Sequence, residues 1–130
     1  MNRVFLDANI LFSAGWREKA GLLRLWRLTD VTLLTSRYAF EEARRNLETQ
    51  EQRKRLIQLM VNVDLVTDFA YGDLPLDVVL PEKDRPILLA AIRAHATHLL
   101  TGDKQHFGPL YGQSISGVLI LRPADYPGFA

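Results

Sequence analysis

The sequence predicts an α/β fold in which a mostly parallel sheet is covered by helices on both faces. Short apolar runs alternate with helical segments along the chain, an order that is typical of parallel strands joined by helices. Two of these runs end abruptly in an acid, at Asp7 and at Asp103. Because the functional crevice of such a sheet lies at the carboxyl ends of its strands, we expect both carboxylates at one edge.

Length and composition indicate a globular domain. The chain has 130 residues and no cysteine, with 48% hydrophobic and 24% charged residues, and we expect residues 1–130 to form a single domain. The lack of cysteine excludes a disulfide framework and thiolate metal sites, and it fits a cytoplasmic protein. We see no apolar run of membrane-spanning length and no signal peptide, so we expect no membrane partner.

Five strands are expected from short runs of Val, Leu, Ile and Phe. They cover residues 3–6, 31–35, 64–67, 97–100 and 118–121. Residues 68–83 contain Gly72, Pro75, Pro81 and several acids, and they are expected to form a loop with at most one helical turn. The resulting sheet should be mostly parallel, because helical segments separate consecutive strands.

Helices are expected between these strands. A short helix begins at residues 9–13, and residues 18–28 form a helix in which Leu22, Leu25 and Trp26 recur at helical spacing. Ser36 suits the N-cap of a helix that runs to residue 47, and a further helix covers residues 50–60.

The later helices are signalled by proline and glycine. Pro86 opens an apolar helix that extends to about residue 96 and should be largely buried. Residues 102–107 form a turn into a short helix, which Gly108 and Pro109 end.

Two adjacent glutamates differ in their helical phase. Ala39, Ala43 and Leu47 form one stripe and should face the sheet. Glu42 borders this stripe, whereas Glu41 lies nearer the opposite side, because neighbouring residues point about 100° apart on a helix. The phase therefore favours Glu42 over Glu41 as a site residue.

The basic residues are concentrated in one helical region although the net charge is only +1. The cluster comprises Arg44, Arg45, Arg53, Lys54 and Arg55. Such a cluster could contact nucleic-acid phosphates. The alternative is a solvated helix face with internal Glu–Arg pairs.

Carboxylates that follow buried strands indicate an oxygen-ligated cation, because a buried acid needs a compensating charge. Each acid has an alternative role, since Asp7 and Asp84 also suit helix N-caps. Asn9 could orient a water or hold the loop, and Thr101 could bind an acid or a phosphate. Zinc is not predicted, because the three histidines at positions 95, 98 and 106 do not form a ligand pattern.

Common catalytic motifs of this fold class are missing from the sequence. There is no glycine-rich phosphate loop and no GxSxG nucleophile motif. These absences argue against a nucleotide cofactor and a serine nucleophile.

Four segments together resemble the PIN-domain ribonuclease family, and within it the toxins of VapC type. They begin with FLDANIL at 5–11 and the segment 36–47, which ends in EARRNL, and continue with DRPILLAA at 84–91 and LLTGDKQHF at 99–107. The segments occur in the family's order and spacing over essentially the whole chain. The resemblance implies a three-layer α/β/α sandwich with a mostly parallel five-stranded sheet. It also implies RNA cleavage that depends on Mg²⁺ or Mn²⁺, with Asp7, Glu42, Asp84 and Asp103 as ligands.

Three classes of function remain open at this stage. The first is a metal-dependent endoribonuclease, the toxin of a toxin–antitoxin pair, with RNA as substrate and an antitoxin protein as partner. The second is a non-catalytic PIN-like RNA-binding or assembly module, which the complete set of acids disfavours. The third is a metal-dependent DNA nuclease or phosphatase that uses the same acids. A homodimer is expected from the resemblance alone.

Overall fold

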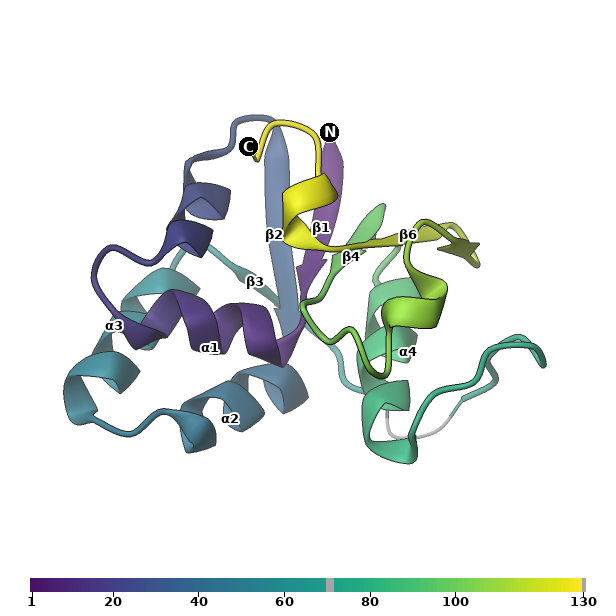
Figure 1. The fold of residues 1–130 in the computed structure, drawn as a ribbon, viewed down its shortest axis with the longest axis horizontal. Coiled ribbons are helices and arrows are strands. Elements are labelled where there is room, and N and C mark those ends of the chain that lie inside the picture. The colour runs from purple at the N-terminus through teal and green to yellow at the C-terminus, as the bar shows by residue number, and fades with distance from the viewer. Residues whose placement is uncertain (70–71, 130) are drawn as a thin grey trace.

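A six-stranded sheet forms the centre of the protein in the computed structural model, which describes residues 1–69 and 72–129 (Figure 1). The strands are β1 (Asn2–Leu6), β2 (Val31–Ser36), β3 (Asp64–Val66), β4 (His98–Leu100), β5 (Ser114–Ile115) and β6 (Val118–Leu121). Five of them are parallel, as predicted, and only β5 is antiparallel to its neighbour β6. The predicted α/β class with a mostly parallel sheet is confirmed.

The sixth strand corrects the prediction of five. β5 and β6 are joined by Ser116 and Gly117, whose φ angles are +48° and +89°. A two-residue hairpin turn with two positive φ values matches the right-handed twist of the strands that it joins. The dipeptide Ser-Gly between two apolar residues was therefore a hairpin signal that the sequence analysis did not use.

The strand order creates a crevice beside β1. The strand order is β3-β2-β1-β4-β6-β5. β2 and β3 are therefore added on one side of β1, and β4 and β6 are added on its other side. In open parallel sheets ligands bind where the order reverses in this way, at the carboxyl ends of the strands. Asp7 directly follows β1, and Asp103 lies three residues beyond β4. Both acids therefore lie at the switch point.

Helices flank the sheet. The α-helices are α1 (Ala8–Trp16), α2 (Arg37–Asn46), α3 (Gln50–Met60) and α4 (Arg85–Arg93), and the 3-10 helices are η1 (Gly21–Arg27), η2 (Glu82–Asp84), η3 (Gly108–Leu110) and η4 (Pro123–Asp125). Figure 1 shows α1, α2 and α3 gathered on one side and α4 on the other. Right-handed crossovers explain this division, because the chain reverses its direction across the sheet between β3 and β4.

Side chains cap α2 and α3, and the cap of α2 at Ser36 was predicted from the sequence. The hydroxyl of Ser36 accepts a hydrogen bond from the amide of Ala39, at 3.2 Å, and fixes the start of α2 directly after β2. Thr49 and Gln52 form a reciprocal capping box at the start of α3. The cap at Ser36 sets the rotation of α2 and so the direction of its acidic residues.

Three helix predictions need correction. The helix expected at 18–28 is the 3-10 helix Gly21–Arg27, in which Leu25 is buried and Leu22 and Trp26 are partly buried. Residues i and i+3 lie on the same face of an α-helix and of a 3-10 helix, so the spacing of apolar residues did not distinguish the two helix types. The helix expected to reach residue 96 ends at Arg93, because His95 adopts a φ of +56°. The last short helix, Gly108–Leu110, begins where an end was expected.

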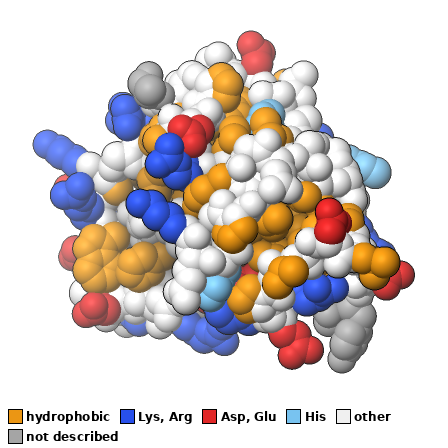
Figure 2. All heavy atoms as spheres, turned by 45° about the vertical axis from the view of Figure 1, so that its right-hand side comes forward, with side chains coloured by type: hydrophobic (Ala, Val, Ile, Leu, Met, Phe, Trp, Pro, Cys, Tyr) orange, Lys and Arg blue, Asp and Glu red, His pale blue; other side chains and the backbone are white. Residues whose placement is uncertain are grey.

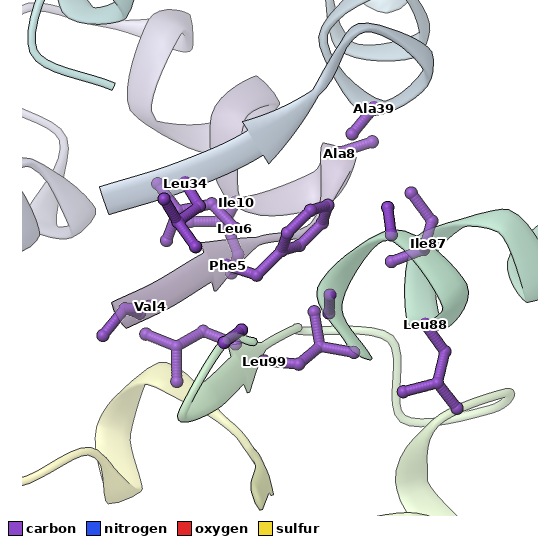
Figure 3. Packing of buried hydrophobic residues seen from close by; sticks show 14 of the residues in the cluster. Val4, Phe5, Leu6, Ala8, Ile10, Leu34, Ala39, Ile87, Leu88 and Leu99 are labelled. Carbon is purple, nitrogen blue, oxygen red and sulfur yellow. The ribbon is translucent and has the colours of Figure 1, made fainter. Parts of the chain in front are cut away.

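The hydrophobic core lies on both sides of β1. Figure 3 shows Phe5 pointing from β1 toward Ile87 of α4, while Leu6, Ile10 and Leu34 gather nearby. Burying a side chain of this size contributes about 1.5–3 kcal/mol. The predicted stripe Ala39, Ala43 and Leu47 is buried, with at most 1% exposure. The helix after Pro86, which was expected to be largely buried, is buried at residues 87–91.

The structure covers only part of the segment on which one prediction falls, and it bears on the search for membrane-spanning helices only within the described residues. The irregular segment expected at 68–83 contains a turn and the first residues of η2, but residues 70 and 71 lie outside the described part of the chain. Across residues 1–69 and 72–129, no helix combines the length and apolar character that crossing a membrane requires.

The basic residues of α2 and α3 mostly bind within the protein. Arg44 pairs with Glu41 at 2.7 Å, as the structural alternative predicts. Arg53 donates to the carbonyl of Leu47 at 2.6 Å, and Arg55 donates to the carbonyl of Gly15 at 2.7 Å. Figure 2, in which the α4 side of the molecule is turned forward, shows Lys and Arg gathered toward its left, with acidic side chains scattered mostly near the edges. The nucleic-acid interpretation of the cluster is thus weakened for these three arginines.

We expect Arg53→Gln to lower the free energy of unfolding by about 1–3 kcal/mol, because the guanidinium forms charge-assisted hydrogen bonds to carbonyls at the end of α2. Lys54→Gln, at the exposed neighbouring position, should change it by less than about 0.5 kcal/mol. Urea unfolding of both variants provides the comparison. Equal stabilities, with weaker RNA binding only for Arg53→Gln, would restore the phosphate-binding interpretation.

Candidate metal centre

Asp7 is held at the junction of β1 and α1. Its backbone amide donates to the carbonyl of Leu100 on β4, at 3.1 Å. Its Oδ1 accepts from the amide of Ala8 at 2.7 Å, so the carboxylate caps α1. The residue is only 4% exposed although it lies at the end of a strand. The alternative role of Asp7 as a helix cap is therefore confirmed, and a second role remains open for Oδ2.

Thr101 and Asn9 connect the two strand ends. Leu6 and Leu100 are partners in the parallel ladder, so the next residues, Asp7 and Thr101, lie side by side. The buried Thr101 hydroxyl donates to Asp7 Oδ2 at 2.7 Å, and it accepts from the amide of Asp103 at 3.1 Å. Asn9 Nδ2 donates to Asp7 Oδ2 at 3.1 Å, and Asn9 Oδ1 accepts from the amide of Gly102 at 2.8 Å. Both residues therefore fix the acids in place.

Asp84, Asp103 and His106 form a second group of side chains beside Asp7. His106 Nδ1 lies 2.9 Å from Asp84 Oδ2 and 3.0 Å from Asp103 Oδ2. The other carboxylate oxygens have separate partners, since Asp84 Oδ1 lies 3.5 Å from Lys83 Nζ and Asp103 Oδ1 accepts from the amide of His106. One oxygen of each acid is thus oriented so that the second oxygen points into the group.

Asp84 is not used as a helix cap. It stands at the N-cap position of α4, but within the described residues its side chain makes no capping hydrogen bond. Instead, Asp84 Oδ2 and His106 Nδ1 are buried and close together, yet in residues 1–69 and 72–129 neither atom has a hydrogen-bond partner of acceptable geometry. Buried polar atoms without partners are costly and call for an explanation such as an ion.

Glu42 and Glu41 face different surroundings. Glu42 is half-buried and lines a hollow of about 460 Å³ together with Asn9, Gly102 and Asp103. Glu41 instead forms two hydrogen bonds to the guanidinium of Arg44, at 2.7 and 3.1 Å. Glu42, which helical phase favoured over Glu41, therefore lies on the side of α2 that faces Asp103.

The electrostatics of Asp7 reflect its crowded position. Burial is the main reason why the pKa of Asp7 is raised to about 6; the charges of Asp84 and Glu42 act in the same direction, and the hydrogen bonds from Thr101 and Ala8 oppose the shift. Desolvation and neighbouring negative charges both disfavour an ionised carboxyl. A divalent cation in this place would favour the ionised form of all these acids.

The raised pKa makes the metal-free protein less stable at neutral pH. Because the folded state holds the Asp7 proton more tightly than the unfolded state, this contribution is complete below about pH 4 and is lost as the pH rises through about 6. We expect a loss of about 3 kcal/mol in the free energy of unfolding. Denaturant unfolding in EDTA across this range should show the loss in the wild type and not in Asp7→Asn. Parallel pH profiles of the two proteins would contradict the expectation.

His106 was not among the site residues predicted from the sequence. His106 stands three residues after Asp103 on a tight turn, where residues three apart can meet, and this spacing was a usable signal. The other two histidines lie elsewhere, with His95 exposed and His98 packed edge-on against Tyr126. Of the three histidines, His106 lies beside the acids, where Asp84, Asp103 and His106 offer ligand atoms within 4.8 Å of one another.

Comparison with known proteins identifies the fold family. Residues 3–105 match the sequence pattern of the PIN domain. The chain belongs to the PIN domain family. No curated protein sequence matches this PIN domain at a significant level. Its fold is similar to that of a chain in the crystal structure of VapBC2 from Rickettsia felis bound to a DNA fragment from their promoter. That match has a TM-score of 0.70 and 15% sequence identity, and it covers 92% of this PIN domain and 98% of that chain.

The residues of this PIN domain fit a hard divalent cation. Carboxylate oxygens are the ligands that Mg²⁺ and Mn²⁺ prefer. Asp84 Oδ2 and His106 Nδ1, which are buried and without hydrogen bonds among the described residues, lie where a cation would give them a partner. The Thr101 hydroxyl donates to Asp7 Oδ2 and accepts from the backbone amide of Asp103, and Glu42 lines the hollow beside Asp103.

Proposed function

We propose that this PIN domain is a metal-dependent endoribonuclease, with Asp7, Glu42, Asp84 and Asp103 holding Mg²⁺ or Mn²⁺. PIN domains are typically nucleases, which makes a phosphodiester hydrolase the expected class of enzyme. The observation that carries the proposal is the meeting of Asp84 and Asp103 ligand atoms beside His106, with Asp84 Oδ2 buried and, in residues 1–69 and 72–129, without a hydrogen bond. Asp7 lies outside this group, but the charge of Asp84 contributes to its raised pKa.

The chemistry needs few groups besides the acids. A bound divalent ion supplies an activated water and stabilises charge on the phosphoryl oxygens. Thr101 and Asn9 keep Asp7 and the 102–103 turn in fixed positions, so that the acids are preorganised before substrate arrives. The hydrogen bond from the Thr101 hydroxyl also favours the ionised form of Asp7, which is the form that binds a cation.

A groove for a nucleic-acid strand is available next to the acids. The hollow that contains Glu42 and Asp103 shares Ser13 and Leu22 with a second hollow of about 390 Å³ beside Phe12 and Trp16. The two hollows run along α1, and a third of about 330 Å³ shares Asn9 and Glu42 with the first and Phe12 with the second. A continuous surface of this kind suits a single strand, because unpaired bases can stack on aromatic side chains.

The fold match supports a toxin–antitoxin role. The similar chain belongs to a VapBC2 complex, and we propose that this PIN domain likewise acts as a toxin in the cytoplasm, restrained by an antitoxin protein. A homodimer remains an expectation from the family resemblance. The product of a short neighbouring gene, mixed with the purified nuclease, should bind it and suppress cleavage. A neighbouring product that neither binds nor inhibits would count against the toxin role.

A cleavage assay with matched substrates tests the activity. Purified protein is incubated with a labelled single-stranded RNA and with the DNA of the same sequence, in Mn²⁺, Mg²⁺ or EDTA. We expect RNA cleavage with either metal and none in EDTA. Cleavage of DNA alone would favour the DNA-nuclease alternative, and binding of RNA without cleavage would favour the non-catalytic module. An Asp103→Asn protein prepared in parallel reports any contaminating nuclease.

A further inference from the structure

The structure assigns an additional ligand to the proposed metal centre: we propose that His106 Nδ1 binds the divalent ion together with Asp84 and Asp103, and that this nitrogen makes the site prefer Mn²⁺ over Mg²⁺. The inference rests on the proposed function, since it concerns the same ion. It extends that function, because the family resemblance implies only the four acids as ligands.

The distances around His106 support a ligand role. Neighbouring ligands of an octahedral ion with bonds of about 2.1 Å lie about 3 Å apart. His106 Nδ1 is 2.9 Å from Asp84 Oδ2 and 3.0 Å from Asp103 Oδ2. Each carboxylate oxygen therefore lies at the spacing of an adjacent ligand position from the imidazole nitrogen, and the three side chains offer ligand atoms within 4.8 Å of one another. Hydrogen bonding does not explain the arrangement, because Asp84 Oδ2 and His106 Nδ1 have no hydrogen-bond partner of acceptable geometry among the described residues.

Burial separates this group from an ordinary acidic surface cluster. The side chain of Asp84 is only 10% exposed, and its Oδ2 points at the imidazole. The Asp103 carboxylate is oriented by the backbone amide of His106 itself, at 3.1 Å. Substituting the His106 side chain thus need not disturb the backbone hydrogen bond that positions Asp103.

A nitrogen ligand has a predictable effect on metal choice. Imidazole is a good ligand for first-row transition metals, whereas Mg²⁺ favours oxygen ligands and retains its waters. A centre with carboxylates and one imidazole should therefore bind Mn²⁺ more tightly than Mg²⁺. Without the imidazole the difference between the two metals should become smaller.

Mn²⁺ bound to the full-length protein gives a direct test. Pulsed EPR of the Mn²⁺ complex should show hyperfine coupling to nitrogen, and this coupling should change when histidine is labelled with ¹⁵N. The coupling should be absent in His106→Gln and present in His95→Asn, the matched control at an exposed position with positive φ. We expect His106→Gln to weaken Mn²⁺ binding by about tenfold or more, with a smaller effect on Mg²⁺.

The outcomes separate this inference from the proposed function. Mn²⁺ that binds without coupling to histidine nitrogen would overturn the role of His106 and leave a carboxylate-only nuclease intact. A protein that binds no Mn²⁺ at all would overturn both. The labelled wild type alone suffices for the decision if His106→Gln does not fold.

Discussion

Asp103→Asn is expected to lower the single-turnover rate of RNA cleavage by at least about a hundredfold. The substitution removes one negative charge from the proposed metal centre, and several kcal/mol of transition-state stabilisation at about 1.4 kcal/mol per decade corresponds to orders of magnitude in rate. The shape is nearly unchanged, because the asparagine oxygen can still accept from the amide of His106.

Folding of the Asp103→Asn protein must be shown in the same experiment. Circular dichroism and the melting temperature should match those of the wild type in EDTA, because both hydrogen bonds that hold the 101–106 turn can form in the variant. A cleanly folded variant that cleaves RNA at the wild-type rate would remove Asp103 from the proposed centre.

Glu42→Gln is expected to reduce cleavage strongly, and Glu41→Gln hardly at all. Glu42 lines the hollow that contains Asp103, and its charge contributes to the raised pKa of Asp7. Glu41 is held by Arg44 in a pair on the protein surface, and loss of such an exposed pair has little effect on stability. The two variants differ by one position on the same helix, so each is the control for the other.

The metal dependence of these two variants separates binding from chemistry. If Glu42 mainly holds the ion, the defect of Glu42→Gln should be larger at limiting Mn²⁺ than at saturating Mn²⁺. A uniform defect would indicate impaired chemistry with the ion bound. If Glu41→Gln proved the more damaging substitution, the assignment of Glu42 would be wrong.

The positions of Asp7 and Asp103 could be predicted because parallel strands impose them. Each acid follows a buried apolar run, and the ladder pairs Leu6 with Leu100, so the strand ends must meet. Their placement at one edge of the sheet is confirmed, whereas their role as ligands remains a prediction. The N-cap at Ser36 and the stripe Ala39, Ala43 and Leu47 were likewise readable, because local rules determine them.

The contact of His106 with Asp84 could not be predicted from local sequence patterns, because it depends on tertiary structure. The contact joins residues 22 positions apart, and it forms only because the 102–107 turn lies against η2 and the start of α4. No periodicity reports such a contact. The same limitation applies to Arg53 and Arg55, which were grouped by charge although they bind carbonyls at the ends of two other helices.

The most direct test follows Mn²⁺ occupancy and RNA cleavage in the same samples. Free Mn²⁺ is measured by EPR while the single-turnover rate is recorded over a titration from EDTA to saturation. The account predicts that the rate is negligible without metal and rises in proportion to the occupancy of the bound ion, and that Asp103→Asn requires much more Mn²⁺ or remains inactive. Cleavage that persists in EDTA, or that does not follow occupancy, would contradict the central claim that these acids hold the ion responsible for cleavage.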